Sequence, residues 1–172
     1  MEFRLAEEKD MVRVITLINQ AKQFLAQQNV DQWQNGYPNA ASIQEDLQKQ
    51  NGYVLCLDGT VVGYACISFD GEPCYADLQG KWLSEQPYAV IHRMVIENQE
   101  KGKGFAGQFF SFAEQLCRTN GIKSVKVDTD RDNLRMQAVL QKLGFVYCGT
   151  VCFDNSEKLR PFQVLCKPEK LT

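Results

Sequence analysis

The sequence predicts an α+β protein in which helices pack on a mixed β-sheet. Two observations lead to this prediction. Apolar segments flank Asp58-Gly59 in the first half of the chain, which is a strong signal for an antiparallel hairpin. In the second half, strand-like and helical segments alternate, which predicts crossover connections. With 172 residues, of which 44% are hydrophobic and 23% charged, the chain is expected to form a single domain over residues 1–172.

Local patterns place the elements of the first half. In the first helix, Met11, Val14 and Ile18 recur on one face. Ser42 to Glu45 has the residue types of a capping box and is expected to begin the second helix. The expected elements are a strand over residues 2–5, helices over 7–27 and 42–50, and strands over 53–57, 60–69 and 75–83.

The second half shows equally local signals. Phe109, Phe110 and Ala113 fall on one helical face, and Gly121 is a natural C-terminal stop for that helix. Gly144 ends a second, shorter helix in the same way. The expected elements are a strand over residues 88–96, a helix over 108–120, a strand over 123–129, a helix over 133–143, and strands over 145–153 and 159–167.

The most informative segment runs from Lys101 to Ala106, between the strand over 88–96 and the following helix. Glycines allow unusual backbone dihedrals and a close approach by a ligand, and the first amides of a helix have no partner within it. Such a turn binds anions, and a diphosphate fits there. The turn therefore suggests a cofactor that carries phosphate. The alternative is a plain tight turn that caps the helix.

Two other phosphate-binding motifs do not fit the sequence as a whole. The nucleotide P-loop pattern does not occur in the chain. The dinucleotide-binding fingerprint G-x-G-x-x-G is matched in letters by Gly102, Gly104 and Gly107. Asp128 follows about 20 residues later, where that motif has its acidic residue. That fingerprint belongs to a doubly wound parallel fold, whereas hairpins dominate the first half of this chain.

Composition excludes several classes of function. The net charge of −2 argues against a nucleic-acid partner. Apolar runs are far too short for a membrane span, and the N-terminus lacks a signal-peptide pattern, so we expect a cytoplasmic protein without membrane contact. Seven cysteines without a C-x-x-C pair, together with a single histidine, support neither a disulfide framework nor a metal site.

Two motifs at matching spacing resemble the GNAT superfamily of acyl-CoA-dependent N-acetyltransferases. The family's cofactor motif Q/R-x-x-G-x-G/A is matched from Lys101 to Ala106, with lysine in place of the usual glutamine or arginine. Further along, an asparagine opens a helix that ends in leucine-glycine-phenylalanine, here Asn133 and Leu143-Gly144-Phe145. The wider pattern is similar to a bacterial subgroup of the family. The resemblance implies a central, mostly antiparallel mixed sheet of six or seven strands, with helices on both faces and a splay between the fourth and fifth strands.

The resemblance also implies how acetyl-CoA, the co-substrate, would bind. Its diphosphate would rest on the main chain of the turn, and its pantetheine arm would pair with the fourth strand, where a main-chain N–H would polarise the thioester carbonyl. Asn133 would lie near the sulfur. The cofactor-binding residues implied in this way are Met94, Val95, Ile96, Lys101, Gly102, Lys103, Gly104, Phe105, Ala106 and Asn133.

The activity implied is transfer of acetyl to a primary amine by direct attack in a ternary complex. Many relatives protonate the departing thiolate with a tyrosine at the position held here by Leu140. Either Tyr147 or water is expected to serve in its place, or the thiolate leaves without a general acid. His92 is the candidate base, because histidine titrates near neutrality and shares strand parity with Met94. A histidine bonded to backbone is the alternative for that residue. The alternatives for the whole chain are an acyl-CoA-binding module without turnover and a structural or interaction domain without a cofactor.

Acceptor contacts are expected from the loop between the first two helices and from the sheet. Trp33 and Tyr37 are candidates to clamp an amine by cation–π contact, or else they close the loop onto the core. Arg93 is a candidate for binding an acceptor carboxylate, with an ion pair as the alternative. Asp128 is a candidate for holding an ammonium, or for pairing with an arginine. The acceptor is expected to be a small-molecule or peptide amine. The sequence leaves the oligomeric state open between a monomer and a homodimer, and dimers are common in relatives.

Overall fold

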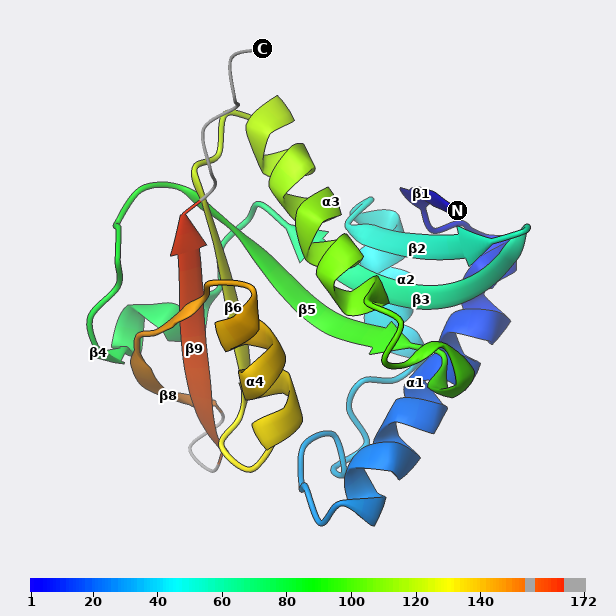
Figure 1. The fold of residues 1–172 in the computed structure, drawn as a ribbon, viewed down its shortest axis with the longest axis horizontal. Coiled ribbons are helices and arrows are strands. Elements are labelled where there is room, and N and C mark those ends of the chain that lie inside the picture. Colours follow the sequence, from blue (N-terminus) through cyan, green and yellow to red (C-terminus); the bar gives the residue numbers. More distant parts are fainter. Residues whose placement is uncertain (154–156, 166–172) are drawn as a thin grey trace. The chain divides into compact units, whose positions relative to one another are not determined.

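The computed structural model describes residues 1–153 and 157–165 (Figure 1). The backbone groups into two compact units, one formed by residues 1–68 and 91–110 and the other by residues 69–90 and 111–172. Strand β5 (Tyr88–Ile96) and helix α3 (Phe105–Thr119) contribute to both units. We call these unit 1 and unit 2 and describe each by itself. The single domain expected from the sequence stays a prediction.

Unit 1 is built on four strands in the order β1-β2-β3-β5. Neighbouring strands β1 and β2 are antiparallel, as are β2 and β3, which form the hairpin predicted around Asp58-Gly59. Besides parts of β5 and α3, the unit contains β1 (Glu2–Leu5), α1 (Met11–Gln27), α2 (Ala40–Gln48), β2 (Gly52–Leu57), β3 (Thr60–Ser68) and the 3-10 turns η1 (Glu8–Asp10) and η3 (Asn98–Glu100).

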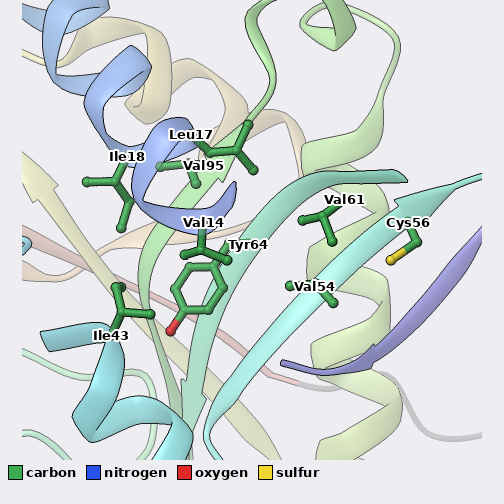
Figure 2. Packing of buried hydrophobic residues seen from close by; sticks show 9 residues of the cluster. All are labelled: Val14, Leu17, Ile18, Ile43, Val54, Cys56, Val61, Tyr64 and Val95. Atoms are coloured by element: carbon green, nitrogen blue, oxygen red, sulfur yellow. The ribbon is translucent and has the colours of Figure 1, made fainter. Parts of the chain in front are cut away.

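Helices α1 and α2 cover one face of this sheet. Their buried side chains, among them Leu17 and Ile43, pack on Tyr64 and Val95 from the strands (Figure 2). Full burial of each such aliphatic side chain stabilises the fold by about 1.5–3 kcal/mol. Gly63, next to Tyr64 along β3, faces the opposite side, where a Cβ would lie 2.8 Å from the ring of Phe109 on α3. Unit 1 therefore has helices on both faces of its sheet, as predicted.

A buried ion pair ties α2 to β5. Arg93 has a φ of +54° in the middle of β5, which indicates a β-bulge. Its Nε donates to Oδ2 of Asp46 at 2.9 Å, and its Nη2 donates to Oδ1 of the same carboxylate. The hydroxyl of Tyr64 also donates to Oδ2 of Asp46, at 2.6 Å. Only 15% of the Arg93 side chain and 4% of the Asp46 side chain are exposed.

Unit 2 has its strands in the order β5-β6-β9-β8-β4, with β7 paired to β9. The strand pairs β6–β9, β8–β9, β7–β9 and β4–β8 are all antiparallel. Besides parts of β5 and α3, its elements are the 3-10 turn η2 (Pro73–Asp77), β4 (Gln79–Gly80), β6 (Ser124–Asp130), α4 (Leu134–Lys142), β7 (Val146–Tyr147), β8 (Gly149–Phe153) and β9 (Glu157–Leu165). Seven strands of at least four residues, with the short β4 and β7, agree with the predicted count.

The predicted strand over 75–83 is wrong. Pro73 stands at the first position of a 3-10 turn, and the carboxylate of Glu72 accepts a hydrogen bond from the amide of Cys74 at 3.4 Å. A proline in the first turn and an acidic cap before it favour a helical turn over an extended strand. Only Gln79–Gly80 is extended in this segment.

Four predicted boundaries also need correction. Helix α3 begins at Phe105, before the predicted start at residue 108. Helix α2 is capped by Asn39, whose side chain accepts from the amide of Ser42 at 3.1 Å, so Ser42 is not the cap. The strand over 145–153 breaks before Gly149, where the backbone of Gln79 approaches so closely that a Cβ would lie 2.3 Å from its carbonyl oxygen. The first helix starts at Met11, after a 3-10 turn. Residues 166–167 of the predicted last strand lie outside the described residues.

Across the described ranges, no helix is both long enough and apolar enough to cross a bilayer.

Asp46→Asn should lower the free energy of unfolding by about 3–5 kcal/mol, because it leaves the Arg93 guanidinium buried without a counter-charge. Urea denaturation measures the change. The matched control is Glu45→Gln, which removes the same charge from the neighbouring, exposed residue that pairs with Lys49. We expect that control to leave the stability nearly unchanged. Equal effects of the two substitutions would show that the buried pair does not hold α2 to β5.

Candidate active site

The glycine turn of unit 1 forms a cradle with open space above it. Gly102 and Gly104 have φ values of +82° and +86°, and a Cβ added to either would meet no atom within 4 Å. These positions therefore need glycine for their backbone conformation and not for lack of room. The first hydrogen bond of α3 runs from the amide of Gln108 to the carbonyl of Gly104 at 3.2 Å, so the amides of Phe105 and Ala106 precede the helical ladder. Positive φ, open space and unused helical amides together fit a diphosphate.

Both lysines of the turn have partners in their own unit. The ammonium of Lys101 lies 3.3 Å from the ring centroid of Phe24 on α1. The ammonium of Lys103 lies 2.8 Å from a carboxylate oxygen of Glu100. An anion placed in the turn would therefore meet the main chain first.

The end of β5 leads from the bulge to the glycine turn. Val95 is buried in the core of unit 1, while Met94 and Ile96 are half-buried. Beyond them, the amide of Glu97 donates to the carbonyl of Val62 at 2.7 Å, and the carboxylate of Glu97 is ion-paired with Arg13. Burial alone would raise the pKa of the Glu97 carboxyl, but the hydrogen bond and charge of Arg13 lower it below its usual value. Glu97 is thus a structural anion and a poor candidate for the base.

His92 is half-buried and directly precedes the bulge. The left-handed conformation of Arg93 interrupts the regular alternation along β5, so strand parity alone does not fix the side of His92 relative to Met94. His92 and the end of β5 still lie in unit 1, together with the glycine turn. Its role as base stays a prediction.

Trp33 and Tyr37 are both engaged by their own chain. Trp33 packs on the core of unit 1, as expected for a residue that closes the loop. The hydroxyl of Tyr37 accepts a hydrogen bond from Arg93, whose guanidinium carbon lies 5.8 Å from the centroid of the Tyr37 ring. Burial opposes the charge of Arg93, but the hydrogen bonds to Asp46 and the nearby Tyr37 raise its pKa above the usual value. Arg93 is therefore a permanent cation that already has an anionic partner.

The remaining predicted residues lie in unit 2. Asn133 caps α4, its side-chain oxygen accepting from the amide of Met136 at 3.1 Å, which confirms that it opens this helix. Leu140 is fully buried. Tyr147 is 46% exposed, and its hydroxyl lies 3.2 Å from that of Thr150. Asp128 accepts a hydrogen bond from the hydroxyl of Tyr75 at 2.6 Å.

Sequence reasoning missed Asp46 and Tyr64, which complete the environment of Arg93. One signal for Asp46 was present: it follows Ile43 by three residues and therefore falls on the buried face of α2. An acidic residue on an apolar face predicts a buried partner. Nothing local in the sequence identifies that partner as Arg93.

Comparisons with known proteins identify the family of the chain. The family model described as Acetyltransferase (GNAT) family matches residues 17–145. A search of curated proteins finds no significant match. The structure of a GNAT-family acetyltransferase from Streptococcus agalactiae is 32% identical, covers 97% of this chain and 96% of its own, and superposes with a TM-score of 0.88.

Two more distant structures share the fold. The ribosomal-protein-alanine N-acetyltransferase of Brucella melitensis is 17% identical, with a TM-score of 0.69 and coverage of 96% of this chain and 99% of its own. The yncA protein of Salmonella typhimurium, solved with its cofactor acetyl-CoA, is 14% identical, with a TM-score of 0.68 and coverage of 100% of this chain and 97% of its own. With a family match over residues 17–145 and a relative 32% identical over nearly its whole length, the chain belongs to the GNAT family of acetyltransferases.

Proposed function

We propose that this acetyltransferase moves acetyl from acetyl-CoA to the primary amine of a small molecule or peptide, by direct attack of the amine in a ternary complex. The observation that carries the proposal is the glycine turn, whose backbone is set for an anion and whose surroundings are open. The family match supplies the reaction type.

The residues present fit the co-substrate. The amides that begin α3 would hold the diphosphate, and the edge of β5 from Met94 to Ile96 would bind the pantetheine arm by main-chain hydrogen bonds. We also assign to Asn133, whose side-chain oxygen caps α4, a contact with the pantetheine arm. When bound, acetyl-CoA supplies the acetyl group as an activated thioester.

Residues of the chain would then transfer protons and stabilise the charge that develops on the carbonyl oxygen. We assign His92 as the group that accepts a proton from the acceptor ammonium, directly or through water. A bulge leaves main-chain groups of β5 out of the regular ladder, and an amide there suits polarisation of a carbonyl oxygen. Leu140 offers no proton, so Tyr147 or water is assigned to protonate the leaving thiolate.

Gly104→Glu should weaken acetyl-CoA binding by about tenfold or more, because it places a carboxylate where the diphosphate would rest. Titration calorimetry measures the affinity. Gly59→Glu is the matched control, since Gly59 also has a positive φ of +79° and no atom within 4 Å of an added Cβ. Both substitutions place the same charged side chain at a glycine of positive φ, so the two variants should differ only in their affinity for acetyl-CoA. Native affinity in Gly104→Glu would place the co-substrate elsewhere.

His92→Gln should lower kcat by about 10²-fold and leave the affinity for acetyl-CoA unchanged, because it removes a base but no cofactor contact. Steady-state rates with a panel of amines test this. An unchanged kcat would assign His92 a structural role. Tight acetyl-CoA binding by the native chain without turnover of any amine would favour the non-catalytic alternative.

A further inference from the structure

Unit 2 contains a cavity whose lining includes none of the residues predicted for the transfer reaction. Its volume is about 350 Å³, within the size range of small-molecule sites, roughly 300–1,000 Å³. Trp82, Tyr88 and Lys126 line it, together with carboxylates from the segment before β4 and from the loop after it. All of its lining residues belong to unit 2, so the cavity is defined within one compact body.

Lys126 is the unusual member of the lining. It lies in the middle of β6, is only 2% exposed, and has its ammonium 3.7 Å from the ring centroid of Trp82 and 3.8 Å from that of Tyr88. Among the residues that the structure describes, no acceptor of a hydrogen bond and no ion-pair partner is recorded for this ammonium. Ring faces attract a cation but accept no conventional hydrogen bond, so its N–H donors are left for an acceptor within the cavity.

Burial lowers the pKa of Lys126, while the charge of Glu85 acts in the opposite direction. A buried ammonium without hydrogen-bond acceptors is costly. An anionic group placed in the cavity would remove that cost, which makes Lys126 the point where a ligand carboxylate would bind.

The opposite sign of charge gathers at the opening. Asp70 and Glu85 are exposed and Glu72 is half-buried, and all three line the cavity. The cavity is therefore positive at its buried end and negative where it meets solvent. A ligand with a single charge would satisfy one end and be repelled by the other, whereas a zwitterion satisfies both.

The loop that carries Trp82 and Glu85 is held in place by a buried glutamine of β9. Gln163 on β9 is fully buried, and its Oε1 accepts from the amide of Leu83 at 2.8 Å and from that of Ser84 at 3.3 Å. Its Nε2 donates to the carbonyl of Ser84 at 3.1 Å and to the hydroxyl of Ser124 at 3.2 Å. Fixing the loop in advance lowers the entropy lost when a ligand binds.

We propose that this cavity binds an α-amino acid, whose carboxylate accepts from Lys126 and whose ammonium lies against the carboxylates at the opening. The site requires neither acetyl-CoA nor the glycine turn, so its test is independent of the transfer reaction.

The experiment is titration calorimetry of the native protein, without acetyl-CoA, against each of the common amino acids in turn. We expect saturable binding of at least one, accompanied by a change in tryptophan fluorescence because Trp82 lines the cavity. The best ligand is then compared with its decarboxylated amine and its deaminated acid. Each analogue should bind about tenfold more weakly or worse. No saturable binding of any amino acid, or equal binding of either analogue, would overturn the proposal.

Lys126→Met keeps the apolar stem and removes the ammonium, so it should weaken binding of the amino acid about tenfold or more. Lys123→Met is the matched control, as Lys123 is an exposed residue just before the same strand, and it should bind like the native protein. Native affinity in Lys126→Met would also overturn the proposal. Thermal unfolding checks that both variants fold, and the analogue comparison on the native protein decides the matter if Lys126→Met does not.

Discussion

The ion pair between Arg93 and Asp46 is the interaction on which the candidate active site depends. Arg93 adopts a left-handed backbone conformation within β5, which costs a residue with a side chain on the order of 1–3 kcal/mol. The conformation persists because the guanidinium donates hydrogen bonds to both oxygens of one buried carboxylate, that of Asp46. Helix α2 places that carboxylate through the packing of Ile43, and Tyr64 of β3 holds it with a further hydrogen bond. Three elements thus fix one bulge, and the bulge sets the direction in which β5 continues.

From that bulge the chain runs directly to the predicted cofactor site. Val95 is locked into the core, and Glu97 is held by Val62 and Arg13, so β5 reaches the glycine turn as a fixed strand. Burying a charged pair rarely adds net stability compared with apolar packing, because desolvation offsets the attraction. The pair between Arg93 and Asp46 is better understood as a positioning device. It holds the strand and, through the hydroxyl of Tyr37, the loop between α1 and α2 in one arrangement.

Local signals explain what the sequence could predict. The glycine turn, the hairpin at Asp58-Gly59 and the helix opened by Asn133 each rest on residues close together in the chain, and the structure confirms them. The strand over 75–83 fails because Glu72 and Pro73, just before it, impose a helical turn. The bulge at Arg93 could not be predicted, since its partner Asp46 is 47 residues away and the bulge alters the side-chain parity on which the placement of His92 depended.

The arrangement around Arg93 also limits how an acceptor can be recognised. An acceptor carboxylate could bind Arg93 only by competing with Asp46, which would leave one buried anion without its partner. The cationic face of Arg93 toward Tyr37 is likewise occupied by an internal contact. Arg93 therefore serves the structure of unit 1 and is a poor candidate for binding an acceptor carboxylate. In the described part of unit 2, by contrast, the buried ammonium of Lys126 faces two aromatic rings and has no anionic partner within ion-pair distance.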